Sequence, residues 1–247
     1  MTQKRFSTVR YLSLCIIFLF TSPAFAQLGK NAAENEMNLR QLMELNGFSP
    51  GARGFDHRYQ GVKGTPFLKQ DYLKGTLVIN EPGAEPIDAQ MNLDLSQHKI
   101  ELLLPNGLSG NLAASRVSSI QLFDQADTLH FISLPAGTVN EPGDDYKLYQ
   151  VLFRSSRYTL LKRTDVYLEK ANYQGAYSPD RRYDEFKPQT KYFLGQPEAY
   201  QVIRLRAKKV LSALKREDAG KAEKWLKENS QSVESEDGLI AVLSHLE

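Results

Sequence analysis

Short runs of alternating apolar and polar residues follow one another from Leu73 to Tyr167. In the clearest run, residues 87–95, Ile, Ala, Met, Leu and Leu occupy every second position. A period of two is typical of a strand with one face against a core. Turn sequences such as Asn80-Glu81-Pro82-Gly83 separate the runs, and no helical pattern lies between them. The pattern therefore predicts a mainly antiparallel sheet, as a twisted sheet, a sandwich or an open barrel.

The turn and alternation signals give approximate strand positions. A hairpin around Ser155-Ser156 is the most regular pair, and Pro135–Asp145 is expected to be a polar loop. Strands are expected at residues 73–79, 87–95, 100–104, 118–123, 128–134, 146–153 and 158–167, with a last hairpin of 191–194 and 200–205.

Beyond the last predicted strand the apolar period changes to 3.6. The first helical stripe consists of Ile203, Ala207, Val210, Leu211 and Leu214. A second helix is expected at residues 219–229. Ser235 is expected to cap a third, with acidic residues in its first turn where the helix dipole favours them. Helices this short need tertiary contacts, so the predicted fold is α+β with a small C-terminal helical cap.

The first 26 residues have the pattern of a secretory signal peptide. Basic Lys4, Arg5 and Arg10 precede the apolar run 11–20, and Ala24-Phe25-Ala26 fits a cleavage site. The apolar run is too short to remain as a membrane helix. We therefore expect an exported protein of the periplasm or the cell exterior, with association with the envelope as one option. The predicted organisation is signal peptide 1–26, a segment 27–71 that packs on the sheet, a β-domain 72–205 and a helical region 206–247.

Charge and cysteine content exclude several functions. Three of the 31 basic residues lie in the predicted signal peptide and none of the 29 acidic ones, so cleavage changes the net charge from +2 to about −1. A near-neutral exported chain has no general electrostatic attraction to nucleic acid. The single cysteine, Cys15, also lies in the signal peptide. Disulfides and thiol chemistry are therefore excluded from the mature chain.

Catalytic signatures are absent from the sequence. The four histidines, at positions 57, 98, 130 and 245, are isolated, and no H-E-x-x-H or G-x-S-x-G motif occurs. Folding alone would have to bring two histidines together, and His130, in an apolar strand, is interpreted as a structural residue. A glycosidase needs only two suitably spaced carboxylates, which 29 acidic residues do not exclude. The sequence predicts no catalytic residue, no metal site and no cofactor.

The stretch from Lys162 to Phe193 combines many aromatic rings with many charges. Rings with polar edges and planar guanidinium groups are suited to stacking on sugars or anchoring a protein. Alternatively, the arginines pair with Asp184 and Glu185 while the rings complete the core. The candidate binding residues are Tyr177, Arg181, Arg182, Tyr183 and Phe186.

Four short motifs resemble a family of secreted Bacteroidetes proteins with no known activity. The resemblance covers most of the mature chain and implies export and a sheet followed by helices, without any catalytic residue. The motifs are Val62-Lys63-Gly64-Thr65-Pro66-Phe67, Tyr158-Thr159-Leu160-Leu161-Lys162, Tyr173-Gln174-Gly175-Ala176-Tyr177 with Tyr183-Asp184-Glu185-Phe186, and Glu236-Asp237-Gly238-Leu239-Ile240.

Together these observations favour a non-enzymatic binding or envelope-associated interaction protein, with an envelope protein or a glycan as partner. The alternative is a hydrolase of glycans or peptides that uses carboxylates or a histidine assembled by the fold.

Replacing Arg181 and Tyr183 together by alanine is expected to weaken capture of a partner from envelope extract and to leave Tm nearly unchanged, because a surface patch contributes little to folding. A pull-down combined with thermal denaturation measures both effects. A large fall in Tm would instead place the stretch in the core.

Overall fold

A computed structural model describes the chain in several ranges. The predicted signal peptide and residues 173–182 lie outside them. The described residues are 37, 39–40, 42–44, 48–51, 59, 61–104, 107, 109–125, 127–172, 183–196, 199–230 and 232–247.

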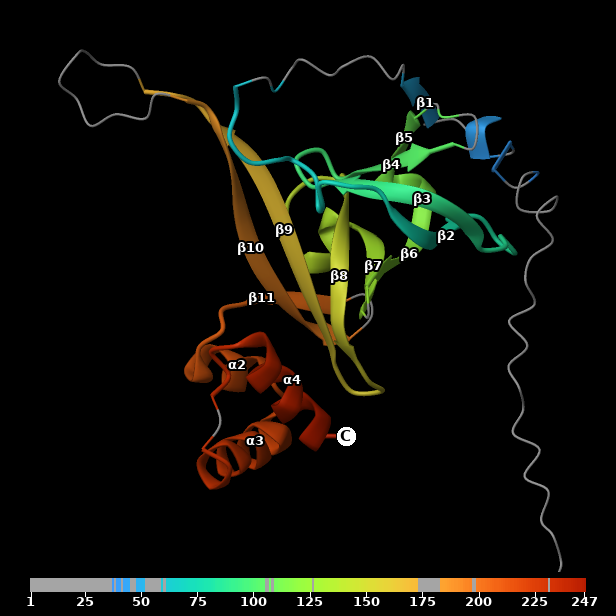
Figure 1. Cartoon of the computed structure of the whole chain (residues 1–247). Coiled ribbons are helices and arrows are strands. Elements are labelled where there is room, and N and C mark those ends of the chain that lie inside the picture. The colour runs from blue at the N-terminus through green and yellow to red at the C-terminus, as the bar shows by residue number, and fades with distance from the viewer. Residues whose placement is uncertain are drawn as a thin grey trace, which may run out of the picture.

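The described strands form one antiparallel sheet, which confirms the predicted fold class (Figure 1). The sheet has eleven strands in the order β1-β5-β4-β3-β2-β6-β7-β8-β9-β10-β11. The strands are β1 (Phe48–Gly51), β2 (Leu73–Ile79), β3 (Ile87–Asp94), β4 (Lys99–Leu103), β5 (Ser109–Ala113), β6 (Val117–Asp124), β7 (Asp127–Pro135), β8 (Tyr146–Arg154), β9 (Thr159–Glu169), β10 (Glu185–Gln196) and β11 (Ala199–Ile203).

The sheet curls strongly around β2. Strands β4, β3 and β2 separate β5 from β6 in the sheet order, yet only the short 3₁₀ helix η2 (Ala114–Arg116) joins them. So short a connection requires β5 to turn back toward β6. Gly75 in β2 permits a close approach, because a Cβ there would lie 2.2 Å from the carbonyl oxygen of Gln121 in β6.

Residues 62–68 cross the open side of this curl. The amide of Phe186 in β10 donates to the carbonyl of Lys63, and the amide of Leu95 donates to that of Pro66. The amide of Val166 in β9 donates directly to Leu95. The end of β3 therefore meets β9 without closing the sheet into a barrel.

Three apolar clusters stabilise the fold. The largest fills the curl and includes Leu77, Met91 and Leu102, each fully buried. It also holds Leu39 and Leu42 of the N-terminal segment. A second cluster joins the C-terminal helices to the ends of β8–β11, and a third lies under β11 and the 3₁₀ helix η3 (Ala136–Val139).

The long strands β9 and β10 form a ribbon that runs from the helices to the opposite end of the molecule (Figure 1). Pro188 lies within β10 opposite Val166. The amide of Phe186 points away from β9 to Lys63, so residue 188, two positions on, also directs its amide position away from β9. Strand β11 does not reach this part of β10, so the missing N–H of proline costs no sheet hydrogen bond.

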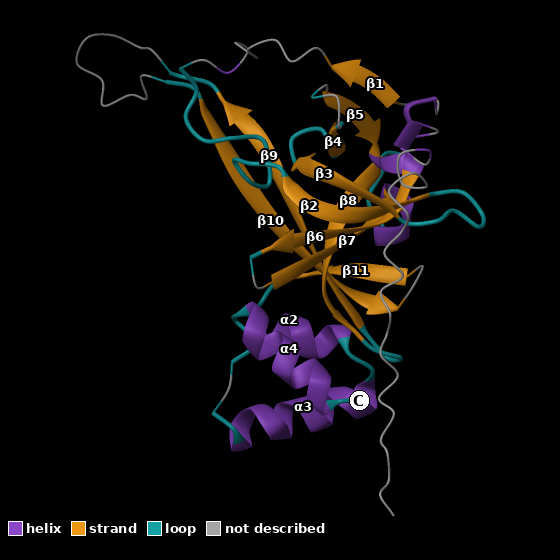
Figure 2. Ribbon diagram, turned by 45° about the vertical axis from the view of Figure 1, so that its right-hand side comes forward, coloured by secondary structure: helices purple, strands orange, loops and turns teal. Residues whose placement is uncertain are grey.

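The three C-terminal helices lie together at one end of the sheet in both views (Figures 1 and 2). They are α2 (Ala207–Ala213), α3 (Arg216–Glu228) and α4 (Glu236–His245). Ser235 caps α4 as predicted, because its side chain accepts a hydrogen bond from the amide of Gly238 at 3.1 Å. The sequence pattern placed Ile203 both in the last strand and on the first helical stripe. Ile203 belongs to β11, and α2 begins at Ala207.

A polar cluster of Arg157, Tyr158 and Asp218, here called the clasp, attaches the C-terminal helices to the β8–β9 turn. Asp218 is fully buried, and its carboxylate accepts a hydrogen bond from the Tyr158 hydroxyl at 2.7 Å. Arg157 forms an ion pair with the same carboxylate at 3.2 Å and donates to the Leu246 carbonyl at 3.1 Å. The clasp therefore ties α3 and the end of α4 to one turn of the sheet.

Within the described ranges, no helix is long and apolar enough to cross a membrane.

Replacing Arg157 by alanine is expected to lower the free energy of unfolding by about 3 kcal/mol, because Asp218 keeps a buried charge without its cation. Trp225, the only tryptophan, lies in α3, so its fluorescence in a urea titration reports on the helical region. Circular dichroism at a strand wavelength follows the sheet in the same samples.

The matched control is Arg154→Ala, since Arg154 is exposed on β8. It should change stability by no more than about 0.5 kcal/mol. Equal midpoints for the two variants would show that apolar contacts alone hold the helices.

Candidate functional site

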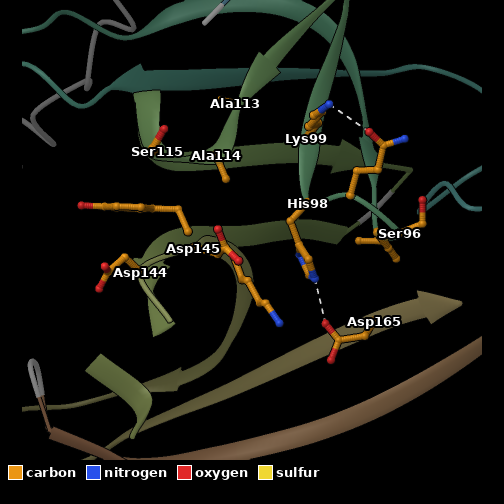
Figure 3. Close-up of a pocket in the computed structure, with 13 residues that line it drawn as sticks. Ser96, His98, Lys99, Ala113, Ala114, Ser115, Asp144, Asp145 and Asp165 are labelled. Carbon is orange, nitrogen blue, oxygen red and sulfur yellow. Dashed lines mark hydrogen bonds and ion pairs between the residues drawn. The ribbon is translucent and has the colours of Figure 1, made fainter. Parts of the chain in front are cut away.

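A recess of about 710 Å³ opens where the β3–β4 turn, η2 and the start of β8 meet (Figure 3). Its volume falls in the range of small-molecule sites. The lining residues are Leu95, Ser96, Gln97, His98, Lys99, Ala113, Ala114, Ser115, Asp144, Asp145, Tyr146, Lys147 and Asp165.

The tight β3–β4 turn places His98 at the bottom of this recess. Buried Asp94 stabilises the turn by accepting hydrogen bonds from the amides of Ser96 and Gln97 at 2.8 and 3.0 Å. His98 then adopts a left-handed backbone with φ of 50°. Its side chain is only 7% exposed and points toward β9.

Both ring nitrogens of His98 are engaged. The Leu148 amide donates to Nδ1 at 3.2 Å, so Nδ1 carries a lone pair. The proton of a neutral ring therefore lies on Nε2, which donates to Oδ1 of Asp165 at 2.8 Å. A histidine bound in this way links β4, β8 and β9, and it has no free nitrogen with which to accept a proton from a ligand.

Behind Asp165 lies Arg163, whose side chain is 1% exposed. Its guanidinium donates to Oδ2 of Asp165 at 3.0 Å and to Oε1 of Glu141 at 3.0 Å. The Tyr149 hydroxyl accepts a further hydrogen bond at 3.1 Å, and the ring centroids of Tyr149 and Phe193 lie 5.5 and 5.3 Å from the guanidinium carbon. The donors of this buried cation are thus directed to two carboxylates and a phenol.

The network keeps its carboxylates ionised. Burial alone would raise the pKa of Asp165, but the hydrogen bond from His98 and the charge of Arg163 outweigh burial and lower that pKa to about 2. The hydrogen bond from Arg163 likewise lowers the pKa of Glu141. Neither group takes up a proton near neutral pH, so neither serves as an acid or base. The network of His98, Asp165, Arg163 and Glu141 instead holds the base of the recess in place, and we call it the floor of the recess.

The rim of the recess carries free charges of both signs. Asp144 and Asp145 are exposed in the loop before β8, and Lys147 follows them in β8. None of the three side chains forms a hydrogen bond or ion pair with the rest of the described chain. Exposed Lys99 donates only to the neutral Gln97 amide oxygen, at 2.9 Å. The rim therefore offers donors and acceptors to a ligand.

Two of the five predicted binding residues lie among the described residues. Tyr177, Arg181 and Arg182 lie outside the described residues. Tyr183 is half-buried, with the ammonium of Lys63 3.6 Å from its ring centroid. Phe186 is 7% exposed and packs edge-on against Tyr59 at 4.9 Å, so its ring belongs to the core. Neither Tyr183 nor Phe186 lines the recess.

The histidines differ from expectation in one respect. His130, interpreted as a structural residue in an apolar strand, is exposed on β7. His98, one of the histidines isolated in the sequence, has a structural role instead. Its partner Asp165 is 67 positions away, and no local motif connects them. Among the described residues, no group of three or more His, Asp or Glu side chains is arranged to hold a metal ion.

Comparison with family models, curated proteins and solved structures finds no match to this chain.

Stability should fall in acid because of Asp165. Its pKa is lower in the folded state than in the unfolded chain, so its stabilisation is complete above about pH 4 and is lost as the pH falls toward 2. Between pH 7 and pH 2, the difference in unfolding free energy between the wild type and Asp165→Asn should shrink by about 2 kcal/mol. Urea titrations across this pH range measure the difference.

Asp127→Asn is the control, because Asp127 is exposed on β7. Its difference from the wild type should stay nearly constant with pH. A pH-independent difference for Asp165→Asn as well would contradict the proposed ionisation of this carboxylate.

Proposed function

We propose that this chain is an exported, non-enzymatic binding protein and that the recess at His98 is its ligand site. One observation carries the proposal: both nitrogens of His98 and both oxygens of Asp165 are already bonded within the protein. The deepest ionisable groups of the recess therefore serve to fix its shape. The rim groups, which have no comparable bonds, are left to contact a ligand.

A rigid floor supports binding in a second way. Association loses affinity when side chains must be ordered on contact. Here the hydrogen bonds form before any ligand arrives. They join His98, Asp165, Arg163 and Glu141, and they cross-link the β3–β4 turn, β8, β9 and the loop after η3. The floor therefore needs little rearrangement, and ligand contacts are not offset by its ordering.

The alternative, a glycan or peptide hydrolase, finds less support in this geometry. Glycosidases place two carboxyl groups on either side of the bond that they cleave. Asp165 is held in the floor, and the remaining carboxylates of the recess, Asp144 and Asp145, are adjacent in one loop. Two neighbouring acids on one side suit ligand contact better than paired acid and base roles.

Export and an envelope partner are further parts of the proposal. Export is supported by the signal-peptide pattern of residues 1–26. The resemblance to secreted Bacteroidetes proteins agrees with this compartment. The aromatic and charged stretch from Lys162 to Phe193 is proposed as a separate surface for an envelope partner.

Replacing Ser115 by tryptophan should abolish ligand binding and leave Tm within a few degrees of the wild type, because Ser115 is an exposed residue of the recess wall. Immobilised protein is incubated with the small molecules of an envelope extract, and retained compounds are identified by mass spectrometry. At least one compound should be enriched tenfold or more on the wild type relative to Ser115→Trp.

Ser244→Trp, on exposed Ser244 of α4, is the matched control and should retain the compound as the wild type does. Equal retention by Ser115→Trp, or no retained compound at all, would refute the recess as the binding site. Conversion of the retained compound into a product would favour the hydrolase.

A further inference from the structure

The charged groups on the rim are divided by sign. Figure 3 shows Asp144 and Asp145 on the side of Ser115, and Lys99 on the side of Ser96, with His98 between them. No ion pair joins these acids to Lys99 or to the rim residue Lys147 within the described part of the chain. The recess therefore presents a pair of carboxylates on one wall and at least one ammonium group on another.

Separated charges of this kind discriminate between ligand classes. A neutral saccharide would partly desolvate the rim charges without supplying a countercharge, which is unfavourable. A ligand with an ammonium at one end and a carboxylate at the other would form charge-assisted hydrogen bonds at both walls. Such bonds are roughly twice as strong as those between neutral groups.

We infer that the recess takes a dipolar ligand of the peptide class, with its amino end at Asp144 and Asp145 and its carboxylate at Lys99. This inference rests on the proposed function and adds the ligand class to it. It selects the peptide over the glycan, and it gives each wall a separate role. Tyr146, half-buried in the lining, supplies apolar surface for the middle of the ligand.

Isothermal titration calorimetry with defined probes tests the inference. The probes are trialanine, N-acetyl-trialanine, trialanine amide and a neutral trisaccharide. Trialanine should bind the wild type, and blocking either end should weaken binding about tenfold, which is one lost charge-assisted contact of about 1.4 kcal/mol. The trisaccharide should bind at least tenfold more weakly than trialanine.

Variants assign each end of the peptide to its wall. In Asp144→Asn with Asp145→Asn, acetylation should no longer matter, while amidation should still weaken binding. In Lys99→Gln the pattern should reverse. Asp127→Asn and Lys221→Gln change exposed charges outside the recess and should behave as the wild type. Tm values confirm that each variant is folded.

The outcomes separate the inference from the proposed function. Binding of the trisaccharide in preference to trialanine, or no detectable trialanine binding, would overturn the peptide class, while the Ser115→Trp comparison would still decide whether the recess binds any compound. Peptide binding that neither of these variants alters would overturn the assignment of the walls. Failure of the Ser115→Trp comparison would overturn both.

Discussion

The fold depends on how the protein balances the charge and satisfies the hydrogen-bond donors of one buried cation, the guanidinium of Arg163. A guanidinium taken out of water is strongly unfavourable unless its donors are satisfied and its charge is balanced. Arg163 in β9 meets this condition through Glu141 after η3, Asp165 in the same strand and the hydroxyl of Tyr149 in β8. These groups come from separate parts of the chain, so they can satisfy the cation only when the strands and loop are correctly assembled. The interaction thereby favours one arrangement of β8, β9 and β10 over alternative registers.

The curl of the sheet determines what this cation can support. Because η2 brings the end of β5 back to the start of β6, the β3–β4 turn faces β9 across the interior. Asp165 then connects the buried cation to His98 of that turn, and the turn forms one wall of the recess. The shape of the recess is therefore a consequence of the curvature of the sheet and of the link that Asp165 makes between Arg163 and His98. Neither depends on the C-terminal helices. Those helices have their own attachment, at Arg157, Tyr158 and Asp218.

Local sequence signals recovered most of the sheet and little of the site. Alternation located strands such as β3 and β8, and the Ser235 cap located α4. Strands β1 and β5 were missed because Phe48–Gly51 and Ser109–Ala113 contain too few apolar residues to alternate. The first half of β10 was missed because a proline such as Pro188 argues against a strand. Pro188 is tolerated there because β11, on the side of β10 away from β9, does not extend that far. The pairing of His98 with Asp165 depends on the curl of the sheet, so no local sequence motif predicts it.

The molecule uses charge in two distinct ways, and burial separates them. Around the buried Arg163 the charges are bonded within the protein and directed at each other, so their effect is to fix geometry. Elsewhere in the recess, the side chains of Asp144, Asp145 and Lys147 have no hydrogen bond or ion pair with another described residue. Exposed groups that could pair with each other contribute little to stability, so folding alone does not explain why Asp144 and Asp145 lie on a different side of the recess from Lys99. A ligand with complementary charges does explain it, because the rigid floor holds the walls apart and leaves their charges to be neutralised by what enters between them.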